Sequence, residues 1–392
     1  MKKIEKVYFG LCSFAVFSEM LKKPLFTSFL RYAESDGEPK GPKMKRYAEF
    51  VSEIYKGGTD LSDCVRNLVF EDENVYVKAV GNMKKISGSM WGAVEHELSV
   101  LSEFSELSPS DFALDMGFEG FIPSYENGTP FDKAEYESRL GSIGKYGYGI
   151  FATNGMFSVD DEGTICPIAS ADRISLDKFV GYKDERQKVM SNTEAFLSGK
   201  PAANILLYGD AGTGKSSTVK AVANHFFEEG LRLIEIRKNQ LLLLPRVMGE
   251  ISGNPLKFII FIDDLSFNQN DDNFSMLKAT LEGSASAKAK NAIIYATSNR
   301  RHIIKETFDD RAGNDIHRND TIQENLSLSE RFGLTVLFAK PEKKLYLEII
   351  HELGERHGIK VTEEVEQKAE AFALRRGYRS ARCAEQFIES LI

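Results

Sequence analysis

In the second half of the chain, short apolar runs alternate with longer stretches that carry apolar residues at helical spacing. Mostly apolar runs of this length are typical of strands buried on both faces, and strands that alternate with helices form parallel sheets. We therefore expect an α/β fold, with a parallel sheet and helices on both of its faces. The expected strands lie at residues 205–208, 231–236, 258–262, 292–297 and 334–338.

The first part of the chain shows a different pattern, in which apolar positions follow helical spacing. One helical stripe runs through residues 91–101, behind a candidate N-cap at Ser87 or Ser89. The stripe consists of Trp91, Val94, Leu98 and Leu101. His96 lies off the stripe, and we expect it to face solvent. Such stripes are most simply core positions, so this region is expected to be mainly helical.

These patterns divide the chain into three predicted domains. Residues 1–170 form a mainly helical N-terminal domain, with short strands, glycines and aromatic residues at its end. Residues 171–340 form the α/β domain. Residues 341–392 form a small subdomain of three helices, separated at Gly358 and Gly377.

The formal charge of −8 lies entirely in the predicted N-terminal domain. Residues 1–170 contain 18 Lys and Arg against 26 Asp and Glu, whereas the remaining residues contain 32 of each. An acidic surface repels phosphate backbones, which disfavours a nucleic-acid-binding module in this domain. The four cysteines are far apart and match no metal or disulfide pattern. No apolar run reaches the roughly 18 residues of a membrane span, and we expect a cytoplasmic protein that does not enter a membrane.

One segment between an apolar run and a helix carries a specific chemical signal. Residues 209–216 read Gly-Asp-Ala-Gly-Thr-Gly-Lys-Ser and match the phosphate-loop pattern G-x-x-x-x-G-K-[ST] at every position. Glycines let backbone N–H groups approach phosphate oxygens, and the following helix adds its positive end. We expect Lys215 to reach the β- and γ-phosphates of ATP, and Ser216 to ligate Mg²⁺. The predicted nucleotide-binding residues of this segment are Gly209, Asp210, Ala211, Gly212, Thr213, Gly214, Lys215, Ser216 and Ser217.

Two further apolar runs end in polar side chains that suit a nucleotide site. The run 258–262 is followed by Asp263 and Asp264, and the run 292–297 is followed by Asn299. In a parallel sheet these ends lie at the same edge as the phosphate loop. Asp263 is the expected Mg²⁺ partner and Asp264 the expected water-activating base. Asn299 is expected to bond the attacking water or the γ-phosphate.

The order and spacing of these pieces resemble the AAA+ ATPase superfamily over about residues 171–392. More closely, the chain resembles an uncharacterised bacterial family of predicted AAA+ ATPases, known by its sequence and not by an activity. The shared segments are GDxGTGKSS, FIIFIDDLSF, IYATSNRRH, LSxRFGL and RSxR. The resemblance implies that Arg331 is an arginine finger that acts on a neighbouring subunit, and hence that the chain forms a homo-oligomer.

The resemblance also assigns residues around the base and in the C-terminal helical lid. It implies that Val180 and Gly181 lie on the adenine side of the nucleotide. In the lid it implies that an arginine contacts the nucleotide, Arg382 being favoured over Arg379. Many AAA+ motors carry glutamate where this chain has Asp264, and the shorter side chain is compatible with slow hydrolysis. However, the segment Ile-Asp-Asp-Leu-Ser-Phe resembles that of the bacterial replication initiator, which hydrolyses ATP.

Three functions are consistent with these observations. The favoured one is a Mg-ATP-hydrolysing AAA+ ATPase that remodels or assembles a protein partner recruited by the acidic N-terminal domain. The second is a DNA-handling factor of the initiator or helicase-loader type, for which Arg300, Arg301 and His302 offer a basic stretch. The third is an ATP-dependent assembly switch with little turnover. Salt-sensitive DNA binding favours the second, and ATP-dependent assembly without phosphate release favours the third.

Overall fold

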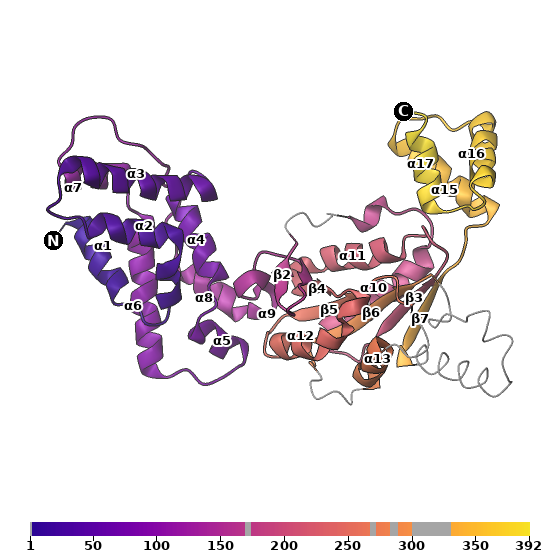
Figure 1. Ribbon diagram of the computed structural model, residues 1–392, viewed down its shortest axis with the longest axis horizontal. Coiled ribbons are helices and arrows are strands. Elements are labelled where there is room, and N and C mark those ends of the chain that lie inside the picture. Colours follow the sequence, from indigo (N-terminus) through magenta and orange to yellow (C-terminus); the bar gives the residue numbers. More distant parts are fainter. Residues whose placement is uncertain (1, 169–173, 267–271, 283–288, 300–330) are drawn as a thin grey trace. The chain divides into compact units, whose positions relative to one another are not determined.

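The computed structural model describes residues 2–168, 174–266, 272–282, 289–299 and 331–392 (Figure 1). The chain forms two compact units. The first comprises Met1–Thr153 and Gly253–Pro255, and the second comprises Asn154–Ser252 and Leu256–Ile392. Among the described residues, no helix is both long and apolar enough to cross a membrane.

The first unit is helical, as the sequence pattern predicts. Its helices are α1 (Lys3–Cys12), α2 (Pro24–Ala33), α3 (Lys40–Gly57), α4 (Leu61–Glu71), α5 (Val75–Gly81), α6 (Gly88–Ser105), α7 (Pro109–Met116), α8 (Lys133–Gly141) and α9 (Ile143–Tyr146). Two 3₁₀ turns, η1 (Ser18–Lys22) and η2 (Gly149–Phe151), complete it. The core of this unit is rich in aromatic rings, among them Phe29, Phe50 and Phe112.

Helix α6 carries the stripe that the sequence predicts. Val94, Leu98 and Leu101 are buried, whereas Trp91, at the start of the predicted stripe, is 38% exposed; the Ser87 side chain caps the helix by accepting the N–H of Met90. The same helix also contains a buried glutamate, which the hydrophobic pattern of the sequence does not predict. Glu97 is 1% exposed, and its carboxylate accepts the N–H groups of residues 15–17 at 2.8–3.1 Å. This carboxylate therefore anchors the turn after α1 by satisfying backbone donors that lack a helical partner.

The second unit is built on a seven-stranded sheet, which confirms the predicted α/β class. The strands are β1 (Met156–Val159), β2 (Ile165–Pro167), β3 (Ile205–Gly209), β4 (Leu231–Glu235), β5 (Lys257–Ile262), β6 (Ala292–Ser298) and β7 (Leu334–Phe338). Their order is β2-β1-β4-β5-β6-β3-β7, and every neighbouring pair is parallel except β1 and β2. Strand β3 lies between β6 and β7, so polar residues that follow β3 and β6 meet at one edge.

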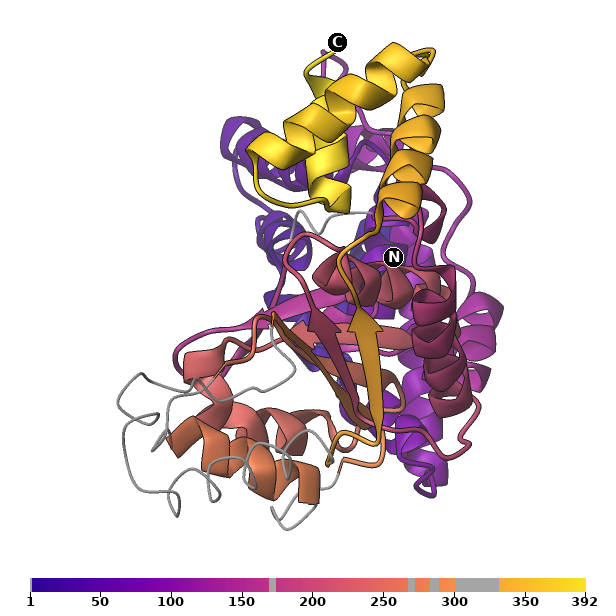
Figure 2. The same cartoon turned by 90° about the vertical axis from the view of Figure 1, so that its right-hand side faces the viewer.

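Helices cover both faces of this sheet (Figures 1 and 2). On one face, alternate strand residues such as Ile205, Leu233 and Phe261 share a core with Val189 and Val222 of α10 and α11. The helices of this unit before the lid are α10 (Lys183–Leu197), α11 (Lys215–His225), α12 (Leu244–Ile251) and α13 (Asp272–Glu282), with the 3₁₀ turns η3 (Leu176–Lys178), η4 (Phe227–Glu229) and η5 (Lys238–Leu243). Burial on both faces explains why these strands read as apolar runs.

The first two strands correct the predicted domain boundary at residue 170. That boundary lies C-terminal to β1 and β2, whereas β1 pairs with β4 and belongs to the second unit. The strands of four and three residues are too short to show a clear periodicity. Their place in the sheet comes from the pairing of β1 with β4, more than 70 residues further along the chain at Leu233, while β2 pairs with β1.

The C-terminal residues form the lid, with its three predicted helices. These are α15 (Lys343–Arg356), α16 (Glu363–Arg375) and α17 (Ala381–Glu389). They enclose a small core of their own, which includes Tyr346, Ile350 and Phe387. Val180, which precedes α10, packs against this core. The lid is thus a separate cluster that touches the α/β part through few residues.

Candidate functional site

The phosphate-loop segment connects the end of β3 to the start of α11. Gly209 has φ +134°, and a Cβ at this position would lie 2.1 Å from the carbonyl oxygen of Phe338 in β7. Gly214 has φ +90° and is the N-cap of α11. Both positions require glycine, the first because backbone approaches it and the second because of its left-handed conformation. The motif glycines therefore shape the loop as the sequence predicts.

Lys215 lies inside this loop and is 6% exposed. Its Nζ donates to the carbonyl oxygens of Gly209 at 2.9 Å and Asp210 at 2.7 Å, and to Asn299 Oδ1 at 3.1 Å. Burial lowers the pKa of the Lys215 ammonium, and nearby carboxylates oppose this shift. The lysine is a desolvated cation held by neutral oxygen atoms, which is a favourable place for an anion.

Asp263 directly follows β5 and binds two hydroxyl groups. Its Oδ1 accepts from Ser216 Oγ at 2.6 Å and from Thr297 Oγ1 at 2.5 Å. The hydroxyl and the carboxylate predicted to hold Mg²⁺ are therefore adjacent. Oxygen ligands of this kind fit Mg²⁺, which keeps several waters and takes few protein ligands. Among the described residues no group of three or more His, Cys, Asp or Glu forms a separate metal cluster.

Thr297 is a residue of this site that the sequence analysis misses. Besides its bond to Asp263, its Oγ1 accepts the N–H of Asp264 at 2.9 Å. It thereby orients both acids that follow β5. A hydroxyl residue near the end of an apolar strand, two positions before Asn299, is the signal that could have indicated it.

Asp264 adopts a left-handed conformation, with φ +50°. Non-glycine residues rarely have positive φ, and such strain is concentrated at functional sites. Asn299 Nδ2 donates to Asp264 Oδ1 at 2.8 Å. Since Asn299 Oδ1 also accepts from Lys215, one amide connects the candidate base to the phosphate-loop lysine.

Asp210 ties the phosphate loop to the segment that leads into the lid. Its N–H donates to the Phe338 carbonyl at 3.2 Å, and its Oδ2 accepts the N–H of Lys340 at 3.0 Å. From the opposite side, the Tyr182 hydroxyl donates to the Ala339 carbonyl at 2.6 Å. The residues between β7 and α15 are therefore fastened to the loop and to the start of α10.

A cavity of about 480 Å³ opens beside the loop. Its lining includes loop residues, the segment before α10, and the lid, namely Lys178, Phe179, Val180, Arg186, Gly212, Thr213, Gly214, Ser217, Ile349, Leu353, Ala381, Arg382 and Glu385, with Ile174. Val180 and Ser217, two residues that the sequence analysis assigns to the nucleotide site, both line this cavity. Ala211 is exposed at the tip of the loop. Gly181 instead lines a neighbouring cavity.

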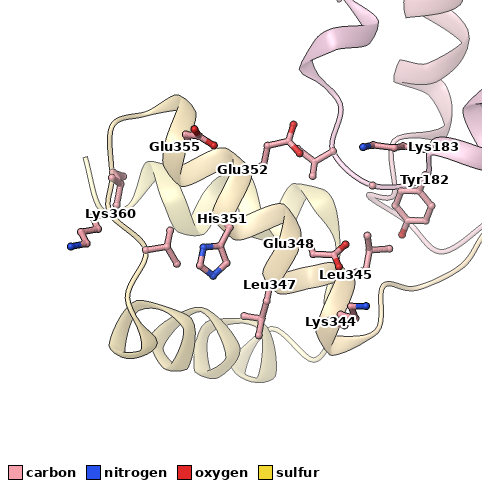
Figure 3. A pocket seen from close by; sticks show the side chains of 14 residues that line it. Tyr182, Lys183, Lys344, Leu345, Leu347, Glu348, His351, Glu352, Glu355 and Lys360 are labelled. Atoms are coloured by element: carbon pink, nitrogen blue, oxygen red, sulfur yellow. The ribbon is translucent and has the colours of Figure 1, made fainter.

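That neighbouring cavity is larger, about 1070 Å³, and lies between the segment Val180–Lys183 and α15 (Figure 3). Gly181, Tyr182, Leu345 and His351 contribute to its wall. No residue of the phosphate loop is among its lining residues. It mixes three lysines with three glutamates, so it offers no excess of positive charge for a phosphate chain. The smaller cavity is therefore the better candidate for a nucleotide.

The two lid arginines lie in different surroundings. Arg379 makes a two-bond ion pair with Glu370 of α16, at 3.0 and 2.8 Å. Arg382 lines the smaller cavity, and its backbone N–H donates to the Gly212 carbonyl at 3.3 Å. Arg382 is thus the one placed beside the loop.

Arg331 lies just before β7. The first residue of β7, Leu334, pairs with Ile205 at the start of β3, whereas the loop follows the other end of β3. A five-residue strand spans about 16 Å. Arg331 and the phosphate loop therefore lie near opposite ends of the strands β3 and β7. The basic stretch Arg300, Arg301 and His302 lies outside the described residues.

Comparison with known proteins identifies relatives of the second unit. A family model described as "Protein of unknown function (DUF815)" matches residues 152–392. The chaperone protein ClpB 2 of Parasynechococcus marenigrum (strain WH8102) is 27% identical over 231 residues, which cover 53% of this chain and 23% of the chaperone. The chain thus spans less than a quarter of the length of that curated relative.

Two solved structures have lower sequence identity to this chain than the chaperone has. The Thermotoga maritima RuvB Holliday junction branch migration motor is 15% identical with a TM-score of 0.37, over 55% of this chain and 63% of that chain. The AMPPCP-bound DnaA from Aquifex aeolicus is 18% identical with a TM-score of 0.39, over 56% of this chain and 64% of that chain. Both solved chains are matched over less than two thirds of their length. The sheet, the loop after β3 and the lid confirm the predicted fold class.

Proposed function

This chain belongs to the family described as "Protein of unknown function (DUF815)", whose description assigns no activity, and we propose from its site that it binds Mg-ATP and hydrolyses it to ADP and phosphate. The observation that carries the proposal is the convergence of Lys215, Ser216 and Asp263 where β3 and β5 end. A buried ammonium, a hydroxyl and a carboxylate in this order supply the phosphate contact and the metal ligands of a nucleotide hydrolase.

Binding uses groups that are already in position. Lys215 Nζ donates to two loop carbonyls, and phosphate oxygens, which are charged acceptors, form stronger bonds with it. The N-terminus of α11 adds its positive dipole. The base then occupies the cavity lined by Phe179, Val180 and the lid. Arg382, which lies beside Gly212, reaches the phosphates from the lid side.

Ser216 and Asp263, which are adjacent, are the residues that would hold the metal ion. When bound, Mg²⁺ neutralises charge on the β- and γ-phosphate oxygens. Thr297 keeps Asp263 Oδ1 turned towards Ser216 through its own hydrogen bond. The site therefore orients its metal ligands before the ion arrives, which is the arrangement expected for fixed outer-shell partners.

Hydrolysis needs a base and a group that stabilises the γ-phosphate. Asp264 accepts the proton of the attacking water, and Asn299 orients the base or the water. Arg331 supplies positive charge to the site of a neighbouring subunit, because the length of β7 separates it from the loop of its own subunit. The active form is accordingly a homo-oligomer with shared sites.

The biological role proposed is the remodelling or assembly of a protein partner. The acidic charge of residues 1–170 disfavours nucleic acid as the ligand of the N-terminal unit. The curated relative is described as a chaperone, which agrees with a protein client. The assembly switch is a second candidate, favoured by the bond that ties Asp264 to Asn299. A DNA-handling factor remains an outcome of salt-dependent binding assays.

The test is ATP turnover by the purified full chain over a range of protein concentrations. Turnover per subunit that rises with concentration, and that is lost in Asp264→Asn, supports a shared-site ATPase. ATP binding without turnover at any concentration supports the switch. Absence of ATP binding in the wild-type chain refutes the proposal. Lys188→Met, an exposed change on α10, serves as a control variant.

A further inference from the structure

One buried cation at the candidate site has no role in the function proposed above. Arg186, on the first turns of α10, is 9% exposed and lines the cavity of about 480 Å³ together with Gly214 and Arg382. Among the described residues, no carboxylate lies within ion-pair distance of its guanidinium. Burying an arginine without an anion is unfavourable, so its retention requires a compensating partner.

The partners of Arg186 belong to the segment Phe179–Tyr182, which we term the wall. Its guanidinium donates to the carbonyl oxygen of Gly181 and lies 5.3 Å from the centre of the Phe179 ring. Burial lowers the pKa of this arginine, and the charges of Glu185 and Glu352 oppose this shift. A guanidinium that stacks on a ring and donates in its own plane fixes both partners at once, which lysine cannot do.

The wall needs such support because its backbone is strained. Gly181 has φ +69° and Tyr182 has φ +50°, so two successive residues are left-handed. A tyrosine in this conformation costs free energy that surrounding contacts must offset. At Gly181 a Cβ would also lie 2.8 Å from Leu345 of the lid. The turn is thus confined between the lid and Arg186.

This wall separates the two cavities. Val180 lines both of them, whereas Gly181 and Tyr182 face the larger one (Figure 3). Phe179 lies on the loop side, 3.9 Å from the Cβ position of Gly214. The Phe179 ring is therefore close both to Gly214 of the loop and to the Arg186 guanidinium, and Arg186 donates to the wall at Gly181 rather than to this glycine of the loop.

We propose that Arg186 is a positioning residue for the nucleotide base, which holds the Phe179 ring and, through the Gly181 carbonyl, the neighbouring Val180 in the conformation that receives the purine. This inference rests on the proposed function, because it requires a nucleotide in the smaller cavity. Arg186 acts through the wall, so its removal weakens the binding of the whole nucleotide. The binding of a phosphate chain that lacks a base does not depend on it.

The experiment compares ATP, ADP and inorganic tripolyphosphate by titration calorimetry on the full chain. Arg186→Met is expected to raise the Kd of ATP and ADP by the same factor, about 10- to 100-fold for a lost hydrogen bond to a charged group. The Kd of tripolyphosphate and kcat at saturating ATP stay unchanged, while KM rises. Lys188→Met, on the same helix and exposed, removes an equal charge and leaves all values unchanged.

Two variants keep the result interpretable. Arg186→Lys retains the charge and the fold but not the planar donor group, and it is expected to show the same selectivity for base-containing ligands with a smaller loss. Equal weakening of ATP and tripolyphosphate, or unchanged ATP affinity in both Arg186 variants, overturns the inference. If the wild-type chain binds tripolyphosphate but not ATP, or binds neither, the proposed function fails instead. Lys215→Ala, expected to lose both ligands, confirms that they share the loop.

Discussion

Asn299 Nδ2 donates to Asp264 Oδ1 at 2.8 Å, and this bond is made to a candidate base whose backbone is left-handed. The oxygen of the same amide accepts from Lys215. Occupation of the loop by a phosphate chain competes for Lys215 and so changes what Asn299 can bind. The base and the phosphate-binding lysine are therefore linked through one side chain, and the predictions below separate their contributions.

Lys215→Ala is expected to abolish ATP binding, because the buried ammonium is the main charge available to the β- and γ-phosphates. Titration calorimetry at near-physiological salt measures this directly, with Lys188→Ala as the exposed control on α10. Tight ATP binding by Lys215→Ala would show that the nucleotide lies elsewhere.

Asp264→Asn is expected to retain ATP binding and to lower kcat by at least about 100-fold, the usual effect of removing a general base. The amide keeps the size of the side chain and an oxygen that can still accept from Asn299. Phosphate release under saturating ATP is the measurement, and Asp184→Asn, exposed at the start of α10, is the matched control. Wild-type turnover in Asp264→Asn would exclude this residue as the base.

Arg331→Ala is expected to spare ATP binding and remove turnover, if the arginine acts on a neighbouring site as we propose. A mixing experiment tests the neighbour directly. Lys215→Ala subunits keep Arg331 but bind no ATP, and Arg331→Ala subunits bind ATP but lack the finger. An equimolar mixture should recover part of the turnover that neither variant has alone. No recovery in co-assembled oligomers would argue against action between subunits.

The two lid arginines should have different phenotypes. Arg382→Ala is expected to weaken ATP binding without changing the unfolding of the ligand-free chain, because it lines the cavity. Arg379→Ala is expected to destabilise the lid, because it loses the two bonds to Glu370. ATP titrations and urea unfolding of both variants distinguish them. Reversed phenotypes would exchange the two assignments.

The Glu370 pair also predicts a pH dependence. The hydrogen bond from Arg379 lowers the pKa of Glu370 below its ordinary value of 4.5. A carboxyl whose pKa is lower in the folded state stabilises the fold above the unfolded value and loses this contribution as the pH falls through the folded one. Glu370→Gln should therefore reduce lid stability at pH 7, and this reduction should become smaller as the pH falls below 4.5. Glu355→Gln, exposed on α15, is the control.

The sequence predicts the chemistry of the loop better than its surroundings. Lys215, Ser216 and Asp263 follow from a motif and from the rule that parallel strands end at one edge, so their meeting could be predicted. Thr297 depends on the register between β5 and β6, which no local pattern encodes. Arg186 looks like a solvated residue in the polar first turn of a helix.

Pairing between distant elements also explains why the sequence does not predict the burial of Glu97 or the place of β1 and β2 in the sheet. Glu97 is one of three glutamates in α6, and its burial depends on where the turn after α1 packs. Strands β1 and β2 are short, and β1, through which both join the sheet, pairs with β4, which is distant in the chain. Periodicity reports which face of an element is buried, whereas these features depend on which element buries it.

The segment Phe338–Lys340, which leads into the lid, is hydrogen-bonded to Asp210 of the phosphate loop and to Tyr182. Any displacement of the loop by phosphates must therefore move this segment, and the lid with it, or break one of these hydrogen bonds. Two dyes, one on α16 and one on α12, would then register occupancy as a change in energy transfer. Such a readout requires no turnover, so it would report nucleotide binding even if the isolated protein does not hydrolyse ATP.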